Sequence, residues 1–272
     1  MRRGSSFVCG LCLLVIFCGC GKDKYKHASA ELYYQEAKEA LIKGKCYQAQ
    51  QLFQNLLSDF PGSHLVDEAQ YGLGQAYLCD KDYVTARFEF ERYLNEYPAS
   101  PFVDEARYQI GMCYYRESRD IHHDQDETLK AIREFSRFVE DYPTAELAKE
   151  AEVKIRELRS KLAAKSLMVA ENYMQWKNYQ SALLYCEEIL RNFRDTDSLY
   201  SARFVLARAK FKMGRLDEAL EDLMALGTDG APEALREKVL EEAQKVQEAI
   251  ARRGPQDAAS DTGAQQNAVG GR

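Results

Sequence analysis

The sequence predicts an all-α fold in which five similar pairs of helices stack into a superhelix. Three observations support this prediction. Tyr34, Tyr71 and Tyr108 recur every 37 residues, each is followed three residues later by Ala or Gly, and an aromatic residue next to Pro recurs along the same stretch. A fixed period of this length is typical of a solenoid, in which each unit packs only on its neighbours. Proteins of this kind usually bind other chains and catalyse no reaction.

The N-terminal segment does not share the repeat. Arg2 and Arg3 precede an apolar stretch over 7–17 that is too short to span a bilayer, so residues 1–19 are interpreted as a signal peptide. The following Gly19-Cys20 resembles the end of a bacterial lipoprotein signal, although Phe stands at 17 where that motif usually has Leu. We therefore expect lipidation (palmitate) at Cys20 and a lipid anchor and tether over 20–30. The alternative is an ordinary cleaved signal.

Repeats one to three are predicted over 31–143, and repeats four and five over 144–228. In each repeat, small residues allow the two helices to approach closely, and larger residues fill the flanking gaps. The small residues of the first helices are Ala37, Gly74, Gly111, Ala170 and Ala207. The alanines of the second helices are Ala49, Ala86, Ala131, Ala182 and Ala219. Pro61, Pro98 and Pro143 end the first three units, because Pro cannot continue a helix.

Two repeats depart from this plan. The third has eight extra residues between its helices, within 117–127, where Asp124 and Glu127 form a predicted capping box. The fourth begins with a stretch, 144–176, that lacks Pro and Gly and suits one long helix or two nearly continuous ones.

The C-terminal part divides into two predicted segments. An amphipathic helix starting at Pro232 is expected within 229–253, where it covers the exposed end of the superhelix. Residues 254–272 are polar and small, and they are predicted to be disordered.

Composition and motifs exclude several classes of function. The 272 residues are 46% hydrophobic, enough for a sizeable core. A net charge of −6 disfavours nucleic-acid binding and broad electrostatic docking on an anionic membrane. The run His122-His123-Asp124 lacks a partner cluster for a metal ion, and no nucleophile or phosphate-binding motif is present. We therefore expect no enzyme activity, no cofactor, no metal and no nucleic-acid partner.

The sequence leaves open whether Cys46 and Cys79 form a disulfide. Cys46 is expected to start the second helix of repeat one, and Cys79 to end the first helix of repeat two. Antiparallel packing brings these ends together, so a disulfide forms if the Cα atoms lie within about 7 Å in an oxidising compartment. Two free thiols are the alternative, since Cys46 also occupies a core position.

The repeat pattern resembles the tetratricopeptide repeat, a helix–turn–helix unit. More specifically, Tyr34-x-x-Ala37 with Pro61-Gly62-Ser63, and the run from Asp124 to Thr128 in the third repeat, resemble the BamD family of outer-membrane β-barrel assembly lipoproteins. The resemblance covers about 20–226. The nearest alternative family, the tetratricopeptide protein of the Tol-Pal system, typically begins with a coiled coil, for which this chain leaves no room after Cys20.

The resemblance implies a function and partners. A BamD-like protein is a lipid-anchored scaffold on the periplasmic face of the outer membrane that helps assemble and insert β-barrel proteins. Unfolded outer-membrane protein clients are then expected on repeats one to three. The central β-barrel assembly protein, with its periplasmic repeats, is expected on repeats four and five. The alternative is a general periplasmic adaptor in Tol-Pal or cell-wall coordination.

The same resemblance implies a peptide-binding surface, because the position three before each small residue faces the concave side of such a superhelix. A row of aromatic and apolar groups suits an extended peptide that carries aromatic side chains, and nearby cations suit a carboxylate. The predicted peptide-binding residues are Tyr34, Lys38, Tyr71, Gln75, Tyr108, Tyr115 and Arg116. The alternative is that the rings only pack between first helices. The client motif is left open.

Overall fold

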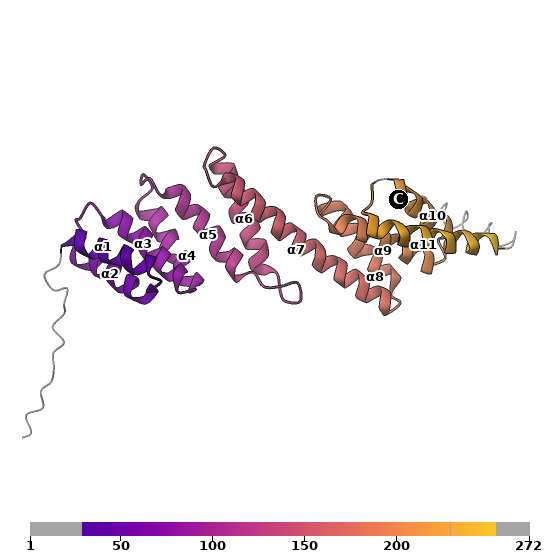
Figure 1. Ribbon diagram of the computed structural model, residues 1–272, viewed down its shortest axis with the longest axis horizontal. Coiled ribbons are helices and arrows are strands. Elements are labelled where there is room, and N and C mark those ends of the chain that lie inside the picture. The colour runs from indigo at the N-terminus through magenta and orange to yellow at the C-terminus, as the bar shows by residue number, and fades with distance from the viewer. Residues whose placement is uncertain (1–28, 229, 254–272) are drawn as a thin grey trace, which may run out of the picture.

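A computed structural model describes residues 29–228 and 230–253, and these form eleven helices and no strand (Figure 1). The first helices of the five pairs are α1 (Ala30–Ile42), α3 (Val66–Cys79), α5 (Val103–Glu117), α7 (Ala148–Gln175) and α9 (Ser198–Lys212). The second helices are α2 (Cys46–Asp59), α4 (Tyr83–Glu96), α6 (Asp126–Asp141), α8 (Tyr179–Asn192) and α10 (Leu216–Thr228). The last helix, α11 (Glu233–Ala251), follows the fifth pair. The all-α fold of five helical pairs plus a C-terminal helix is confirmed.

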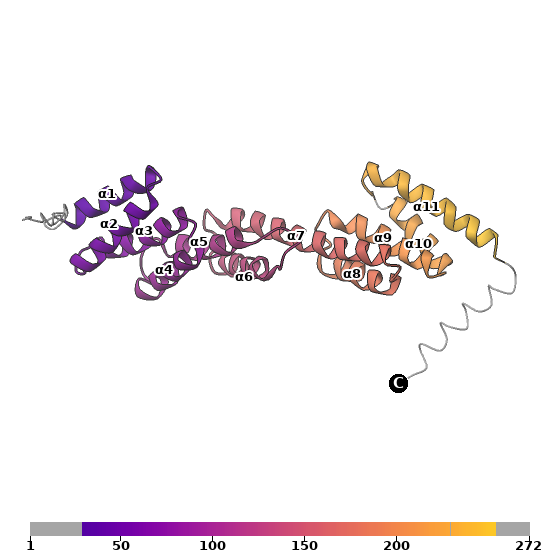
Figure 2. The same cartoon turned by 90° about the horizontal axis from the view of Figure 1, so that it is seen from below.

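The pairs follow one another along the long axis, with α1 at one end and α11 at the other (Figures 1 and 2). The predicted signal peptide, Cys20 and the 254–272 tail lie outside the described residues. Within the described part of the chain, no helix combines the length and the apolar character needed to cross a membrane.

The tight turns inside four of the pairs have a common cause. The residue after each helix cap has a positive φ, and the next backbone N–H reaches back across the last turn, as Lys45 N does to Ala40 O over 2.8 Å. Glycine accepts this left-handed conformation without strain, whereas Lys adopts it at a modest steric cost. The four positions are Gly44, Lys81, Lys177 and Gly214. Repeat three, which has the insertion, instead ends α5 at Ser118 in an extended conformation.

The small residues work as predicted, because all ten aligned positions are buried. Phe rings from the second helices take the space that a side chain would fill. A Cβ added to Gly74 would lie 2.7 Å from the Phe90 ring, and one added to Gly111 would lie 2.7 Å from the Phe135 ring. Real Cβ atoms do not approach a packed ring this closely, so glycine is required at both positions.

The fourth repeat opens with one continuous helix, α7, of 28 residues. Its first half contributes Ala148, Ala151 and Leu158 to the core of repeat three. Its second half contributes Ala170 to a separate core with Leu183 of α8. The helix therefore joins the two groups of repeats, as its oblique course in Figure 1 shows.

The insertion 118–125 is fastened to α7. Lys161 Nζ donates to Ser118 Oγ over 2.7 Å and to the Arg119 carbonyl over 3.1 Å.

The predicted capping box is wrong. Asp124 Oδ1 accepts from the N–H of Asp126 over 2.8 Å, and the helix begins only at Asp126 with Gln125 as its cap. Glu127 is then the second residue of the helix, one position too early to close the box.

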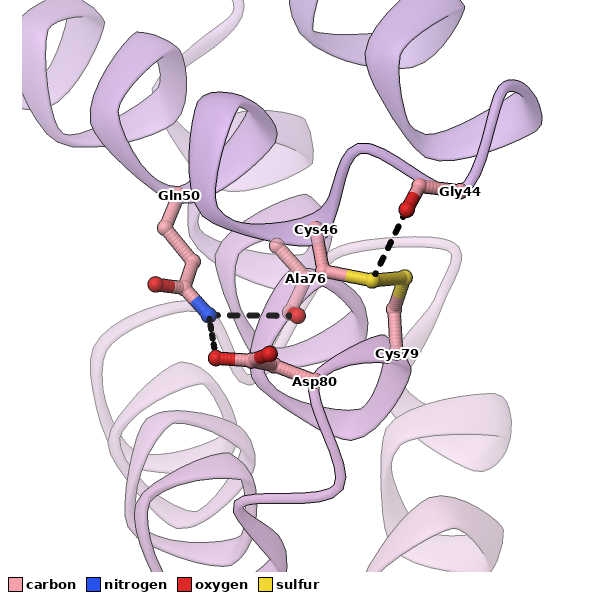
Figure 3. Close-up of a disulfide and its surroundings, with 6 residues drawn as sticks. All are labelled: Gly44, Cys46, Gln50, Ala76, Cys79 and Asp80. Carbon is pink, nitrogen blue, oxygen red and sulfur yellow. Dashed lines mark hydrogen bonds between the residues drawn. A yellow bond between two sulfur atoms is a disulfide. The ribbon is translucent and has the colours of Figure 1, made fainter.

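Cys46 and Cys79 are joined by a disulfide with a Cα–Cα distance of 5.5 Å (Figure 3). The bond connects the first residue of α2 to the last residue of α3, where the sequence placed these cysteines. Beside it, Gln50 Nε2 donates to the Ala76 carbonyl over 3.4 Å and to Asp80 Oδ2 over 3.3 Å. Repeats one and two are thus tied covalently and by hydrogen bonds at one edge.

The C-terminal helix covers the last pair, as predicted. Val239 and Val246 of α11 are buried in one cluster with Leu223 and Leu226 of α10. This contact removes from water an apolar face that the end of a superhelix otherwise exposes.

Candidate functional site

The described residues form a groove of about 510 Å³ between the first helices of repeats two, three and four. Its apolar surface comes from Leu78 at the end of α3, from Met112 on α5 and from Leu147 just before α7. Charged groups line it as well, namely Lys81, Arg116 and Glu150. The groove therefore combines an apolar floor with cations and one carboxylate.

Two predicted peptide-binding residues, Tyr108 and Arg116, line this groove. Tyr108 is only 4% exposed, and its ring packs 5.4 Å and 5.6 Å from those of Phe135 and Phe138. Its hydroxyl is buried beside Glu150 without a hydrogen bond of normal geometry; burial, and then Glu150, hold the pKa of this phenol well above its usual range. Arg116, in contrast, is exposed. Tyr108 thus shapes the groove wall, and Arg116 offers a solvent-accessible cation.

Tyr71 belongs to an aromatic cluster between α3, α4 and α5. Its ring stacks on Phe102 at 5.3 Å with an interplanar angle of 11°, and lies 5.7 Å from Phe90. Burial raises the pKa of Tyr71 to about 12, while a hydrogen bond with Gln75 acts in the opposite direction. Tyr71 and Gln75 are both partly buried, so each presents only part of its surface to a ligand.

Tyr34, like Tyr71, is partly buried. Its ring meets Phe53 edge-on at 6.2 Å. Lys38 Nζ lies 5.2 Å from the centre of the ring, which suits a cation–π contact. Burial, followed by the neighbouring Glu68, raises the pKa of Tyr34 above its usual range.

Each repeating tyrosine therefore packs on the phenylalanine of its own second helix. This differs from the alternative weighed from the sequence, in which the rings only pack between first helices. The peptide-binding role of Tyr34, Tyr71 and Tyr108 stays a prediction.

The hydroxyl and the ring of Tyr115 both contact charged residues of α7. Its hydroxyl donates to Glu157 Oε2 over 2.7 Å, and Lys154 Nζ lies 4.6 Å from its ring centre. The hydrogen bond from Tyr115, with help from Lys154, lowers the pKa of Glu157. Tyr115 thus connects α5 to α7.

Sequence reasoning missed several groove residues. On α5, Met112 lies one helical turn from both Tyr108 and the predicted Arg116, and Gln109 lies one turn before Met112, so a helix-face analysis would have found Met112 and Gln109. Leu147 and Glu150 depend on where α7 begins, which the sequence did not define. No group of three or more His, Cys, Asp or Glu in the described residues is placed to hold a metal ion. His123 instead pairs with Asp120 at 3.0 Å.

Comparison with known proteins decides the family. Residues 26–223 match the family described as YfiO, outer membrane lipoprotein. The chain belongs to this family. The match runs from before α1 into α10, so all five helical pairs of this YfiO-family protein take part in it. The resemblance stated from the sequence is confirmed.

Relatives of this chain bear the name outer membrane protein assembly factor BamD. The Rickettsia prowazekii (strain Madrid E) protein is 27% identical over 226 residues, which cover 79% of this chain and 88% of the relative. The Caulobacter vibrioides (strain ATCC 19089 / CIP 103742 / CB 15) protein is 26% identical over 215 residues, covering 77% and 70%. Among solved structures, a thermophilic tetratricopeptide-repeat protein of Thermus thermophilus matches 80% of this YfiO-family chain and 98% of its own, with 17% identity and a TM-score of 0.35.

Proposed function

We propose that this chain is a lipid-anchored assembly factor for outer-membrane β-barrel proteins, acting at the periplasmic face of the outer membrane. Membership of a family of outer membrane lipoproteins supports the proposal, as do relatives named for outer-membrane protein assembly. The anchor is the lipid on Cys20. The protein is a binding scaffold, and it carries out its role through contacts rather than chemistry.

The groove between α3, α5 and α7 is the observation that carries the client-binding part. An unfolded barrel strand alternates apolar and polar side chains, and at a chain end it adds a carboxylate. Met112 and Leu147 offer apolar contacts for such a segment, and Arg116 offers a charge-assisted hydrogen bond to a carboxylate. Glu150 lies on the same groove and disfavours a second acidic group there.

The second partner is the central barrel protein, which docks through repeats four and five. Trp176, 70% exposed at the end of α7, and Leu184, 58% exposed on α8, provide apolar anchors on that half. Large aromatic side chains are the commonest energetic centres of protein interfaces. Separate surfaces allow the client and the central barrel protein to be bound at the same time.

A charge reversal tests the groove. Arg116→Glu should weaken binding of a peptide with an aromatic residue at its free C-terminus by about tenfold or more, because the carboxylate then meets a like charge. Arg133→Glu, an equally exposed position on α6 outside the groove, is the matched control and should leave affinity unchanged. Equal affinities for wild type and Arg116→Glu, measured by fluorescence anisotropy, would remove the groove from the proposal.

The tyrosines need a paired measurement. Tyr108→Ala should lower stability by about 3–5 kcal/mol, as expected for a buried aromatic residue. Tyr34→Ala should cost less stability but weaken peptide binding if its exposed face contacts the client. Melting temperature by circular dichroism and peptide affinity per folded molecule distinguish the two roles.

Fractionation and capture test the rest. Cys20→Ala should release the protein from the membrane fraction or leave an unprocessed precursor, and an unchanged membrane fraction would contradict the lipid anchor. Capture from solubilised outer membranes should recover a barrel protein with periplasmic repeats. Recovery of a Tol-Pal component instead would favour the adaptor alternative.

A further inference from the structure

The turns inside repeats one and two present apolar side chains to solvent. Ile42 at the end of α1 is 84% exposed, and Tyr47 at the start of α2 is 69% exposed. Val84 and Phe88, one helical turn apart on α4, are each 59% exposed. We call these four residues the turn patch. Their exposure is unusual, because most other side chains of this size in both repeats lie in or against the core, although Leu32 of α1 is 47% exposed as well.

The disulfide ties together the two turns that carry the turn patch. It bonds the start of α2 to the end of α3 (Figure 3), and α4 begins shortly afterwards at Tyr83. Tyr47 and Val84 occupy equivalent positions in the two second helices, each two residues before the buried alanine. The covalent bond therefore fixes the two neighbouring turns relative to each other.

Lysines flank these apolar groups although the chain as a whole has a charge of −6. Lys43 and Lys45 lie between Ile42 and Tyr47, and both are exposed. Lys43 pairs with Glu39, whereas Lys45 makes no salt bridge within the described part of the chain. Exposed aliphatic and aromatic side chains flanked by lysines are typical of protein surfaces that bind at the lipid headgroup region.

The turn patch lies within reach of a membrane that holds Cys20. Nine residues, 21–29, separate Cys20 from the first residue of α1. Such a segment spans at most about 30 Å. Helix α1 has 13 residues, so it is about 20 Å long. The turn after α1 can therefore touch the bilayer in which the lipid on Cys20 is inserted.

We infer that the turn patch lies on the anionic phospholipid surface beside the lipid anchor, as a second and weaker membrane contact. This inference rests on the proposed function only for the anchor at Cys20. Ile42 and Tyr47 enter the headgroup region, and Lys43 and Lys45 face lipid phosphates. Two contacts separated by the length of α1 fix how the superhelix stands on the membrane, which a single flexible tether does not do.

Vesicle sedimentation of the unlipidated mature chain, residues 20–272 with Cys20→Ser, tests the turn patch independently of the anchor. Vesicles of phosphatidylethanolamine with phosphatidylglycerol should bind the chain, and raised salt should weaken the binding. The double variant Ile42→Asp with Tyr47→Asp should lower the partition coefficient by about tenfold or more. The matched control, Met224→Asp with Leu240→Asp, changes residues that are 54% and 67% exposed elsewhere and should bind as the parent does.

Three results would overturn the inference: no binding by the parent chain, equal binding by parent and patch variant, or an equal loss in the control. Normal vesicle binding by the patch variant, together with the loss of a protein crosslink in whole outer membranes, would assign the surface to a protein partner instead. Circular dichroism confirms that each variant is folded. Peptide affinity of the groove, measured on the same variants, should not change, and a failure there concerns the proposed function alone.

Discussion

Repeats one to three and repeats four and five are built from the same kind of helical pair. Different side chains fill the space between the two helices in the two groups. Four residues after the buried alanine, the second helices of the first group carry phenylalanine, while Cys186 and Leu223 take this position in the second group. In repeats two and three the facing first helices carry Gly74 and Gly111, which meet the Phe rings, whereas Ala37 of repeat one keeps an alanine there, as do Ala170 and Ala207 of repeats four and five. In repeats two and three, volume is therefore exchanged between the two helices of a pair.

The two groups also differ in how neighbouring elements are tied together. A disulfide joins repeats one and two. Repeats four and five rely on ion pairs, such as Arg159 with Asp195 at 2.6 Å and Lys210 with Asp222 at 2.6 Å. A ring packed on glycine tolerates little change, whereas a small side chain packed on alanine tolerates more. The first group should therefore be the more sensitive to mutation.

The largest expected difference comes from truncating the aligned core position. Phe135→Ala should cost about 3–5 kcal/mol of unfolding free energy, because it leaves a cavity beside Gly111 that the backbone cannot fill. Cys186→Ala, its counterpart in repeat four, removes one sulfur atom and should cost about 1 kcal/mol. Urea unfolding followed by circular dichroism measures both. Equal costs would show that the two groups are packed alike.

Removal of the disulfide should come next. Cys46→Ser with Cys79→Ser opens a link between residues 33 apart in sequence, and the expected loss is about 2–4 kcal/mol. Hydrogen exchange should show the loss in α1 to α4, with α8 to α10 unaffected. A reductant should reproduce the effect in the wild type and do nothing to the double variant; a loss spread over all five pairs would contradict the distinction between the groups.

A methyl group added at glycine should have opposite effects at two sites. Gly74→Ala should destabilise by about 1–3 kcal/mol, since its Cβ meets the Phe90 ring. Gly227→Ala, at a helical site whose added Cβ meets nothing within 4 Å, should stabilise by about 0.5–1 kcal/mol through helix propensity. Thermal melts of both variants check the sign, and two shifts in the same direction would refute this account of the glycines.

The smallest effect is expected at alkaline pH. Burial raises the pKa of Tyr71 from its ordinary value of 10.0 to about 12 in the folded protein. Because the folded state then holds this proton more tightly than the unfolded state, its contribution is fully present below pH 10 and is lost between pH 10 and 12. Tyr71→Phe should therefore lose less stability over this window than the wild type. Parallel pH profiles would contradict the prediction.

Much of the fold was predictable because each repeat of a solenoid contacts only its sequence neighbours, so the pattern of residues within a repeat determines its packing. Each small residue marks a close helix contact. The absence of Pro and Gly in 144–176 predicted either one long helix or two nearly continuous ones, and α7 is the first of these. The capping box failed because Asp124 closes a turn with Asp126, a choice that depends on how the insertion lies on α7. The sequence could not decide whether the disulfide forms, because this depends on the distance between two helix ends. The spacing of the cysteines along the chain does not determine that distance.

The candidate site was predictable only in part. The period placed Tyr34, Tyr71 and Tyr108 in equivalent positions, but it did not show how deeply each is covered. Tyr108 is buried because it shares a core with Ala148 and Ala151 of α7, whose start the sequence left undefined. Accessibility is set by the element that follows, and a repeat pattern contains no information about it.

The unbroken course of α7 has a geometric consequence. With 28 residues and about 1.5 Å of rise per residue, it separates the cores of repeats three and four by a fixed length and a fixed angle. One inserted or deleted residue in its middle would rotate everything from α8 onward by about 100° relative to repeats one to three. The separation and relative orientation of the two groups of repeats therefore change in steps of one residue. Length changes near the middle of this helix should be tolerated only in steps close to whole turns, whereas the 118–125 insertion can vary without turning one half against the other.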